Sequence, residues 1–149
     1  MKGELTGGCL CGQVRYRLTN EFRMLPYACH CTDCQSRTGS AFSEHMLVGT
    51  GDVHLEGKTD CGWYVQPSRA KSQIVGCAQC KTRIYAINGE RPGMASLRCG
   101  TLDRSAEVEP HAHIWVRSKQ PWIVLPPDAL VMAELPRTNE EWMALVWPK

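Results

Sequence analysis

The sequence predicts a mainly β protein with a short helix near its C-terminus. Polar and apolar residues alternate in short segments, and glycine and proline separate these segments. Helical patterning is scarce before residues 138–146, where a polar residue and two acidic residues precede an apolar face. At 149 residues, 43% of them hydrophobic, the chain can bury its own core, so we expect one domain over residues 1–149.

The expected strands follow one another along most of the chain. The clearest is 13–19, whose strict alternation predicts a strand with one buried face. Segments 42–48 and 52–55 flank Gly49-Thr50-Gly51, a pattern that predicts a hairpin. The other expected strands are 25–28, 63–66, 72–75, 82–87, 94–97 and 113–116, with a turn at Pro67 and Ser68.

Two short helices complete the expected elements. Residues 32–37 are expected to form a helical turn, with Thr32 as its N-cap. The C-terminal helix is expected to begin at Thr138, after an extended approach that contains several prolines.

Composition argues against several classes of partner. The net charge is only +2, from 17 basic and 15 acidic residues, which does not suit a nucleic-acid-binding surface. No stretch reaches the roughly 18 apolar residues that a membrane helix requires. The first residues show no secretory signal pattern, so we expect a cytoplasmic protein in which cysteines stay reduced. An odd count of nine cysteines also favours metal ligation over a disulfide framework.

Seven of the nine cysteines form three tight clusters, and two of these predict a closed metal site. Thiolate pairs suit the soft, tetrahedral preferences of Zn²⁺. In one pair the cysteines are separated by one residue (Cys9 and Cys11), and in the other by two residues (Cys77 and Cys80), so a shared ion would connect the start of the chain to its middle. Lys81 stands where the turn after such a pair often has glycine. The four expected ligands of this structural zinc are Cys9, Cys11, Cys77 and Cys80.

The third cluster, Cys29, Cys31 and Cys34, supplies three thiolates within six residues and so predicts an incomplete site. A catalytic zinc commonly has three protein ligands and one exchangeable position, which a substrate thiol could fill. A zinc-bound thiol loses its proton near neutral pH and becomes nucleophilic. The alternative is closure by a fourth protein ligand, for which the candidates are Cys61, Cys99, His30, His45, His111 and His113.

Four segments together resemble the glutathione-dependent formaldehyde-activating enzyme family. They are GGCLCGQVRY at 7–16, CHCTDCQSRTGSAF at 29–42, CAQC at 77–80 and GTLD at 100–103. The resemblance extends over about residues 5–122, which leaves 123–149 as a C-terminal extension. It implies an Mss4-like fold of short antiparallel sheets, with one structural zinc on the four-cysteine site and a catalytic or labile zinc on the triplet.

The resemblance also implies an activity and its substrates. Members of the family are carbon–sulfur lyases that join glutathione to formaldehyde, giving S-(hydroxymethyl)glutathione. By this analogy the thiol would be glutathione or another small thiol, and the electrophile a small aldehyde. Because the Mss4-like fold also hosts non-catalytic zinc modules, the competing interpretation is such a module, with both zinc ions structural and a surface that binds a protein partner.

The residues that follow the triplet are the expected substrate contacts. Arg37 could pair with a glutathione carboxylate, and Gly39 and Ser40 could donate backbone N–H groups. Alternatively, Gly39 only turns the chain and Arg37 is a solvated surface charge. Trp63 and Trp122 are candidates for the wall of a pocket, although nothing in the sequence selects them.

Overall fold

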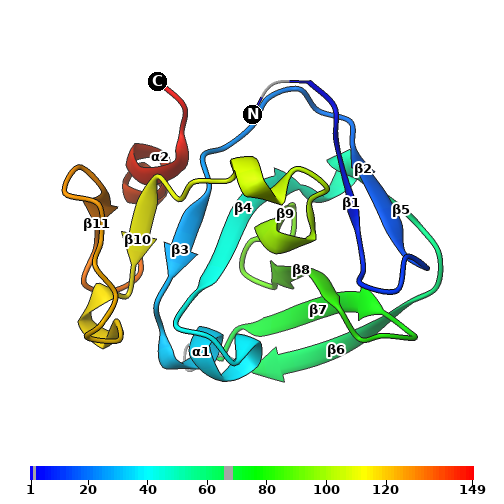
Figure 1. Ribbon diagram of the computed structural model, residues 1–149, viewed down its shortest axis with the longest axis horizontal. Coiled ribbons are helices and arrows are strands. Elements are labelled where there is room, and N and C mark those ends of the chain that lie inside the picture. The colour runs from blue at the N-terminus through cyan, green and yellow to red at the C-terminus, as the bar shows by residue number, and fades with distance from the viewer. Residues whose placement is uncertain (2, 66–68) are drawn as a thin grey trace. The chain divides into compact units, whose positions relative to one another are not determined.

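The computed structural model describes residues 1, 3–65 and 69–149, and over these residues the protein is mainly β (Figure 1). The described residues contain eleven strands and two α-helices, the second of them short and close to the C-terminus. The predicted fold class is therefore confirmed. The expected turn at Pro67 and Ser68 lies outside the described residues. The chain divides into unit 1, residues 1–23 and 47–108, and unit 2, residues 24–46 and 109–149.

Unit 1 begins with a three-stranded antiparallel sheet in the order β1-β2-β5. Its strands are β1 (Leu5–Gly8), β2 (Arg15–Leu18) and β5 (Val53–Glu56). Tyr16 and Leu18 are buried in β2 while their neighbours are exposed, as the alternation in 13–19 predicted. This sheet fixes both ends of the turn that carries the first cysteine pair.

The hairpin predicted at Gly49–Gly51 is wrong. Residues Thr50–Asp52 form a turn of 3-10 helix, and β5 pairs with β2 instead of with the strand before that turn. Two backbone bonds explain the departure, because Thr19 N–H donates to the Asp52 carbonyl and Thr50 N–H donates to the Gly93 carbonyl. Contacts distant in sequence thus outweigh the local turn signal.

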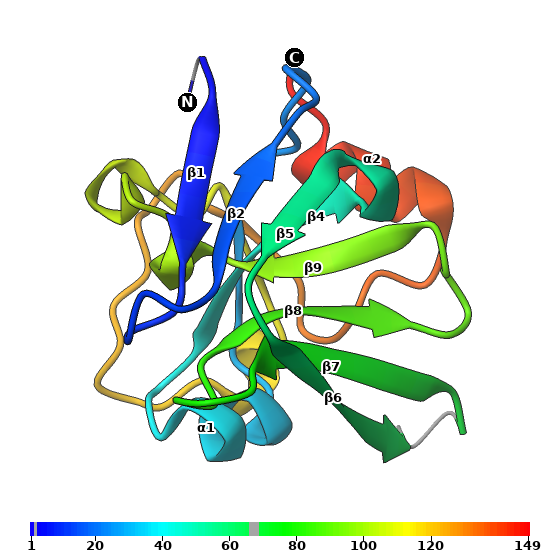
Figure 2. The same ribbon diagram turned by 90° about the vertical axis from the view of Figure 1, so that its right-hand side faces the viewer.

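The rest of unit 1 contains an antiparallel meander in the order β9-β8-β7-β6, whose strands follow one another from top to bottom in Figure 2. Its strands are β6 (Thr59–Val65), β7 (Lys71–Cys77), β8 (Arg83–Asn88) and β9 (Met94–Arg98). β7, β8 and β9 coincide with expected strands to within two residues at each end. β6 begins four residues before the expected segment 63–66, whose last residue lies outside the described residues. The turn from β7 to β8 carries the cysteine pair at 77 and 80.

Unit 2 contains strands in the order β11-β10-β3-β4. They are β3 (Tyr27–Cys29), β4 (Ser43–Gly49, whose last three residues belong to unit 1), β10 (Ala112–Ile114) and β11 (Leu130–Val131). The β3–β4 pair is antiparallel, but β10 runs parallel to both β3 and β11. The expectation of antiparallel sheets therefore holds for the β3–β4 pair but not for the two pairs that β10 makes.

The two helices of unit 2 are α1 (Thr32–Thr38) and α2 (Asn139–Val146). Thr138 caps α2 as predicted: it accepts from the Glu141 N–H, and the Glu141 carboxylate accepts from the Thr138 N–H. Trp142 is buried and meets Tyr27 edge-on, with ring centroids 5.4 Å apart. No helix in the described part of the chain has the length and apolar character needed to cross a membrane.

Candidate metal centres

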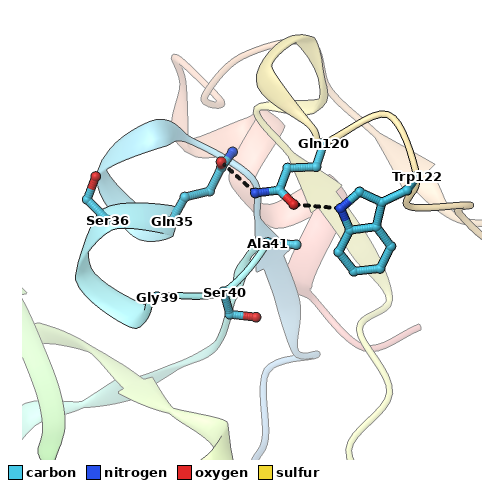
Figure 3. Close-up of a pocket in the computed structure, with 7 residues that line it drawn as sticks. All are labelled: Gln35, Ser36, Gly39, Ser40, Ala41, Gln120 and Trp122. Atoms are coloured by element: carbon cyan, nitrogen blue, oxygen red, sulfur yellow. Dashed lines mark hydrogen bonds between the residues drawn. The ribbon is translucent and has the colours of Figure 1, made fainter.

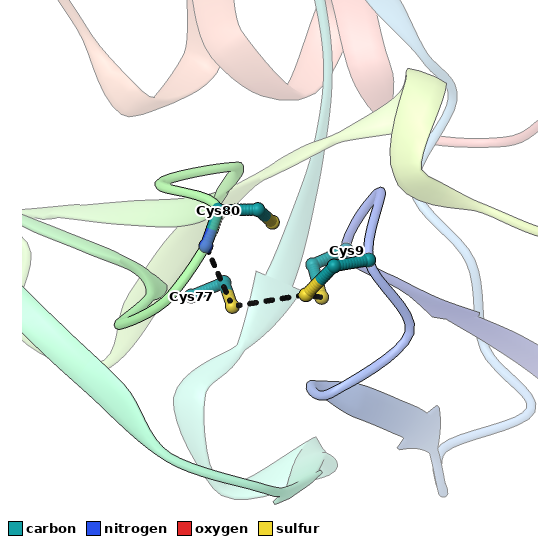
Figure 4. A group of neighbouring side chains, drawn as sticks. Cys9, Cys77 and Cys80 are labelled. Carbon is teal, nitrogen blue, oxygen red and sulfur yellow. Dashed lines mark hydrogen bonds between the residues drawn. The ribbon is translucent and has the colours of Figure 1, made fainter.

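The first cysteine cluster joins two turns of unit 1. Cys9 and Cys11 lie between β1 and β2, Cys77 ends β7, and Cys80 lies in the turn before β8. The four sulfur atoms all lie within 4.8 Å of one another, and Figure 4 shows three of these side chains turned inward. The Cys11 sulfur is 3.5 Å from that of Cys9 and 3.8 Å from that of Cys77. Zn–S bonds of about 2.3 Å in a tetrahedron place sulfurs about 3.8 Å apart, so the four thiols fit zinc.

Nearby donors suit three of the four thiols, those of Cys9, Cys77 and Cys80, to carrying negative charge. The Val14 N–H donates to the Cys9 sulfur at 3.2 Å, and the Cys80 N–H donates to the Cys77 sulfur at 3.5 Å. Hydrogen bonds from the Thr82 hydroxyl and N–H lower the pKa of the Cys80 thiol to about 5. Such donors stabilise thiolates, the form in which cysteine binds metals.

Lys81 makes the turn without glycine by adopting a left-handed backbone. Its φ is 61°, a region that side chains other than glycine and asparagine seldom occupy. Its N–H donates to the Cys77 carbonyl, and its ammonium pairs with Asp60. These two contacts of Lys81 therefore stabilise the strained turn after Cys80.

The second cluster is contained within unit 2. Cys29 ends β3, Cys31 precedes α1, and Cys34 lies in the first turn of that helix; their sulfurs lie within 4.8 Å of one another. The prediction of Thr32 as N-cap is wrong, because Cys31 is the N-cap and its sulfur accepts from the Cys34 N–H at 3.3 Å. One cysteine thus both begins the helix and contributes to the cluster.

Electrostatics within the triplet favour a bound cation. Hydrogen bonds from Cys29 and Cys34 lower the pKa of the Cys31 thiol to about 2. The same neighbours, together with burial, raise the pKa of Cys29 far above its ordinary value. Three sulfurs this close cannot all ionise unless a cation shares the site, because each thiolate opposes the next. The three thiols therefore suit a soft divalent metal.

No fourth ligand completes the triplet within the described residues, since no other Cys, His, Asp or Glu brings a ligand atom within 4.8 Å of all three sulfurs. Among the candidates, the His45 Nε2 lies 3.9 Å from the Cys34 sulfur. His30 and His113 are buried and share a 2.9 Å hydrogen bond between their rings. His111 is exposed; in unit 1, Cys99 is buried and Cys61 lies exposed on β6.

A pocket of about 490 Å³ opens beside α1, starting at the residue after Cys34 (Figure 3). Its size falls in the range of small-molecule sites. It is lined by residues of α1, the loop after it and a later segment of unit 2: Gln35, Ser36, Gly39, Ser40, Ala41, Gln120 and Trp122.

The three expected substrate contacts occupy different positions around this pocket. Gly39 and Ser40 line it, whereas Arg37 is exposed and is not part of the lining. The Gly39 N–H already donates to the Gln35 carbonyl, and the Ser40 N–H donates to the Thr38 hydroxyl. Both backbone N–H groups that the sequence offered to a substrate therefore already have acceptors within the chain. Gln120 was not foreseen, because a lone glutamine carries no sequence signal.

Comparisons with known proteins bear on the family and the fold of this chain. Residues 4–118 match the family model described as glutathione-dependent formaldehyde-activating enzyme. A crystal structure of a Rhodobacter sphaeroides protein is similar, with a TM-score of 0.51 and 20% sequence identity, over 70% of this chain and 97% of that one. That likeness concerns the fold alone. No curated protein matches the chain.

Proposed function

Because the chain belongs to the glutathione-dependent formaldehyde-activating enzyme family, we propose that it is a zinc-dependent carbon–sulfur lyase. In this proposal it adds the thiolate of glutathione to formaldehyde or to a related small electrophile. Two zinc ions serve different purposes. Cys9, Cys11, Cys77 and Cys80 hold a structural ion, and Cys29, Cys31 and Cys34 hold the ion next to which the thiol reacts.

The observation that carries the proposal is the three-thiol cluster that no fourth described residue completes. A closed Cys₄ or Cys₃His site would be expected of a purely structural ion. The pocket begins on the same helix that carries Cys34, so a thiol bound there has room for the rest of its molecule. The four-sulfur cluster has no such opening in its ligand set.

The reaction adds an S–H bond across a carbonyl group. The sulfur forms a bond to the aldehyde carbon, the C=O π pair moves to oxygen, and the proton that leaves sulfur ends on that oxygen. Zinc, when bound, supplies thiolate at neutral pH by lowering the pKa of a coordinated thiol. The chain positions the three cysteines through the end of β3 and the start of α1, with the Cys34 N–H donating to Cys31.

The first test is zinc content per chain, measured before and after dialysis against a mild chelator. We expect two zinc ions falling to one, with the fold retained by circular dichroism. Cys31→Ser should hold one zinc ion, whereas Cys61→Ser, which changes an exposed thiol outside both clusters, should hold two. Two ions that both resist the chelator would support the non-catalytic zinc module instead.

The second test is the rate of S-(hydroxymethyl)glutathione formation, followed by NMR exchange at low reactant concentration. The addition proceeds without a catalyst, so the relevant quantity is the increase over the spontaneous rate. Wild type and Cys61→Ser should show the increase, and Cys31→Ser should not. An increase that survives Cys31→Ser would place the chemistry elsewhere and refute the proposed site.

A further inference from the structure

Three side chains of the pocket form a row of hydrogen bonds (Figure 3). The Gln120 amide N–H donates to the Gln35 Oε1 at 3.2 Å, and the Trp122 indole N–H donates to the Gln120 Oε1 at 2.7 Å. The Gln35 amide N–H groups donate in turn to the carbonyls of His30 and Ser118, at 2.9 and 3.0 Å. Backbone carbonyls only accept and an indole N–H only donates, so the donor and the acceptor of each hydrogen bond in the row are fixed.

The segment that carries Gln120 and Trp122 is held from a second side. The Lys119 ammonium donates to the carbonyls of Gln120 and Ile123, at 3.2 and 2.7 Å. Both pocket side chains thus sit on a segment fixed at its own backbone and tied to α1 through Gln35. Such preorganisation reduces the ordering that a ligand must impose.

Two features of this arrangement remain available to a ligand. Within the described residues, the Gln120 amide keeps one N–H and one oxygen lone pair without a partner. One donor beside one acceptor complements the N–H and C=O that a single residue of an extended peptide presents on the same side. The Trp122 side chain, 70% exposed, offers an indole face on which a planar amide can pack.

The pocket is poorly suited to a carboxylate. None of its seven lining residues carries a formal charge. Lys119 is engaged with two carbonyls, and Arg37 lies outside the lining. A carboxylate taken into the pocket would lose hydration without gaining an opposite charge.

We propose that Gln120 and Trp122 form a subsite that recognises the peptide backbone of the thiol substrate, and so selects peptide thiols over simple ones. The proposal rests on the proposed function in taking a thiol as the substrate. The carboxylates of the peptide stay in solvent, and the uncharged backbone between them enters the pocket.

Calorimetric titration of the zinc-loaded protein tests the subsite with two probes. S-methylglutathione has the peptide amides but no free thiol, and 2-mercaptoethanol has a thiol but no amide. Trp122→Ala and Gln120→Ala should each weaken S-methylglutathione binding by about tenfold, the scale of one packed aromatic or one buried hydrogen bond. Neither change should alter zinc content or the affinity for 2-mercaptoethanol. Trp63→Ala, which removes an equally exposed tryptophan on β6, is the matched control and should change nothing.

Three results would overturn the subsite: no binding of S-methylglutathione to wild type, unchanged affinity in both variants, or an equal loss for 2-mercaptoethanol. The proposed reaction is judged separately by turnover. If S-methylglutathione binds and the variants weaken it while glutathione and formaldehyde show no catalysed addition, the subsite stands and the reaction does not.

Discussion

Gly7 occupies a position of β1 where no side chain fits. A Cβ there would lie 2.4 Å from both the Thr101 carbonyl oxygen and the Tyr16 hydroxyl. Gly7→Ala should therefore lower the free energy of unfolding by about 1–3 kcal/mol, the range for overpacking. Urea denaturation of the zinc-loaded protein measures this change.

Gly62→Ala is the matched control, because a Cβ at Gly62 meets nothing within 4 Å and the residue also lies in a strand. Its denaturation midpoint should equal that of wild type. Equal midpoints for Gly7→Ala and wild type would show that β1 can move away from Thr101, contrary to the close packing described.

Asp103 links the Gly-Thr-Leu-Asp element to the first sheet. Its carboxylate accepts from Arg15 in β2 and from the Thr6 hydroxyl in β1, and these bonds lower its pKa below the ordinary 3.8. A carboxyl with a lowered folded-state pKa stabilises the fold above its unfolded pKa, and the effect is lost as pH falls through the lower folded value. Asp103→Asn should thus reduce the melting temperature by the same small amount at pH 8 and at pH 5.

The effect should also shrink in high salt, since both partners are nearly half exposed and screening weakens such pairs. Differential scanning fluorimetry of wild type and Asp103→Asn at the two pH values gives the comparison. A difference that already disappears at pH 5 would assign the stabilisation to another titrating group.

Residue chemistry was predictable where it depends on composition and spacing. The two thiols of each pair are close in sequence, so the convergence of the thiols within a pair followed from the geometry of a short turn. The capping role of Cys31 was not predictable, because sulfur is a weak acceptor and Thr32 is the usual residue type for a cap. Nor was Gln120, whose position depends on Gln35, 85 residues earlier in the chain.

At the scale of elements, α2 depends on its N-terminal cap. Thr138→Ala removes the acceptor for the Glu141 N–H and should destabilise the protein by about 1 kcal/mol. Thr138→Ser keeps the hydroxyl and should restore most of the loss. Hydrogen exchange of the α2 amides measures both variants, and equal protection in Thr138→Ala and wild type would contradict a stabilising cap.

Strands with one buried face were the elements best predicted from the sequence. β2 alternates as half-buried strands do, and β7, β8 and β9 of the meander fell on expected segments, whereas only the last part of β6 did. β1 was missed because two of its four residues are glycines. β11 was missed because it has only two residues, and backbone bonds from Leu130 to the His111 carbonyl and from Met132 to the His113 carbonyl define it.

For the whole molecule, the pairing of strands was the least predictable feature. β5 lies beside β2 and not β4, and β10 pairs in parallel with β3 although residues 30–111 lie between these two strands in the sequence. Local sequence patterns indicate which residues of a strand are buried, but which strands pair depends on contacts between distant segments. The cysteine clusters constrain such contacts only in unit 1, where the first cluster joins the turn between β1 and β2 to the turn between β7 and β8.

The two proposed zinc sites should therefore differ in their effect on stability. Cys11 and Cys77 are 66 residues apart, so an ion at the first cluster closes a long loop and cannot bind the unfolded chain in the same way. Cys29, Cys31 and Cys34 lie within six residues, so the unfolded chain can also bind zinc there, and binding to the unfolded state reduces stabilisation. Loss of the first ion should consequently destabilise the fold more than loss of the second.

Melting temperatures of Cys9→Ser and Cys31→Ser, each verified to hold one zinc ion, measure this difference. Cys9→Ser should lower the melting temperature by roughly 10 °C, the effect expected for losing a cross-link over a loop of this length. Cys31→Ser should lower it by less than half as much, and Cys61→Ser should leave it unchanged. If Cys31→Ser were the more damaging change, the triplet would be holding distant parts of the chain together, which is the behaviour of a structural ion and not of one that awaits a substrate thiol.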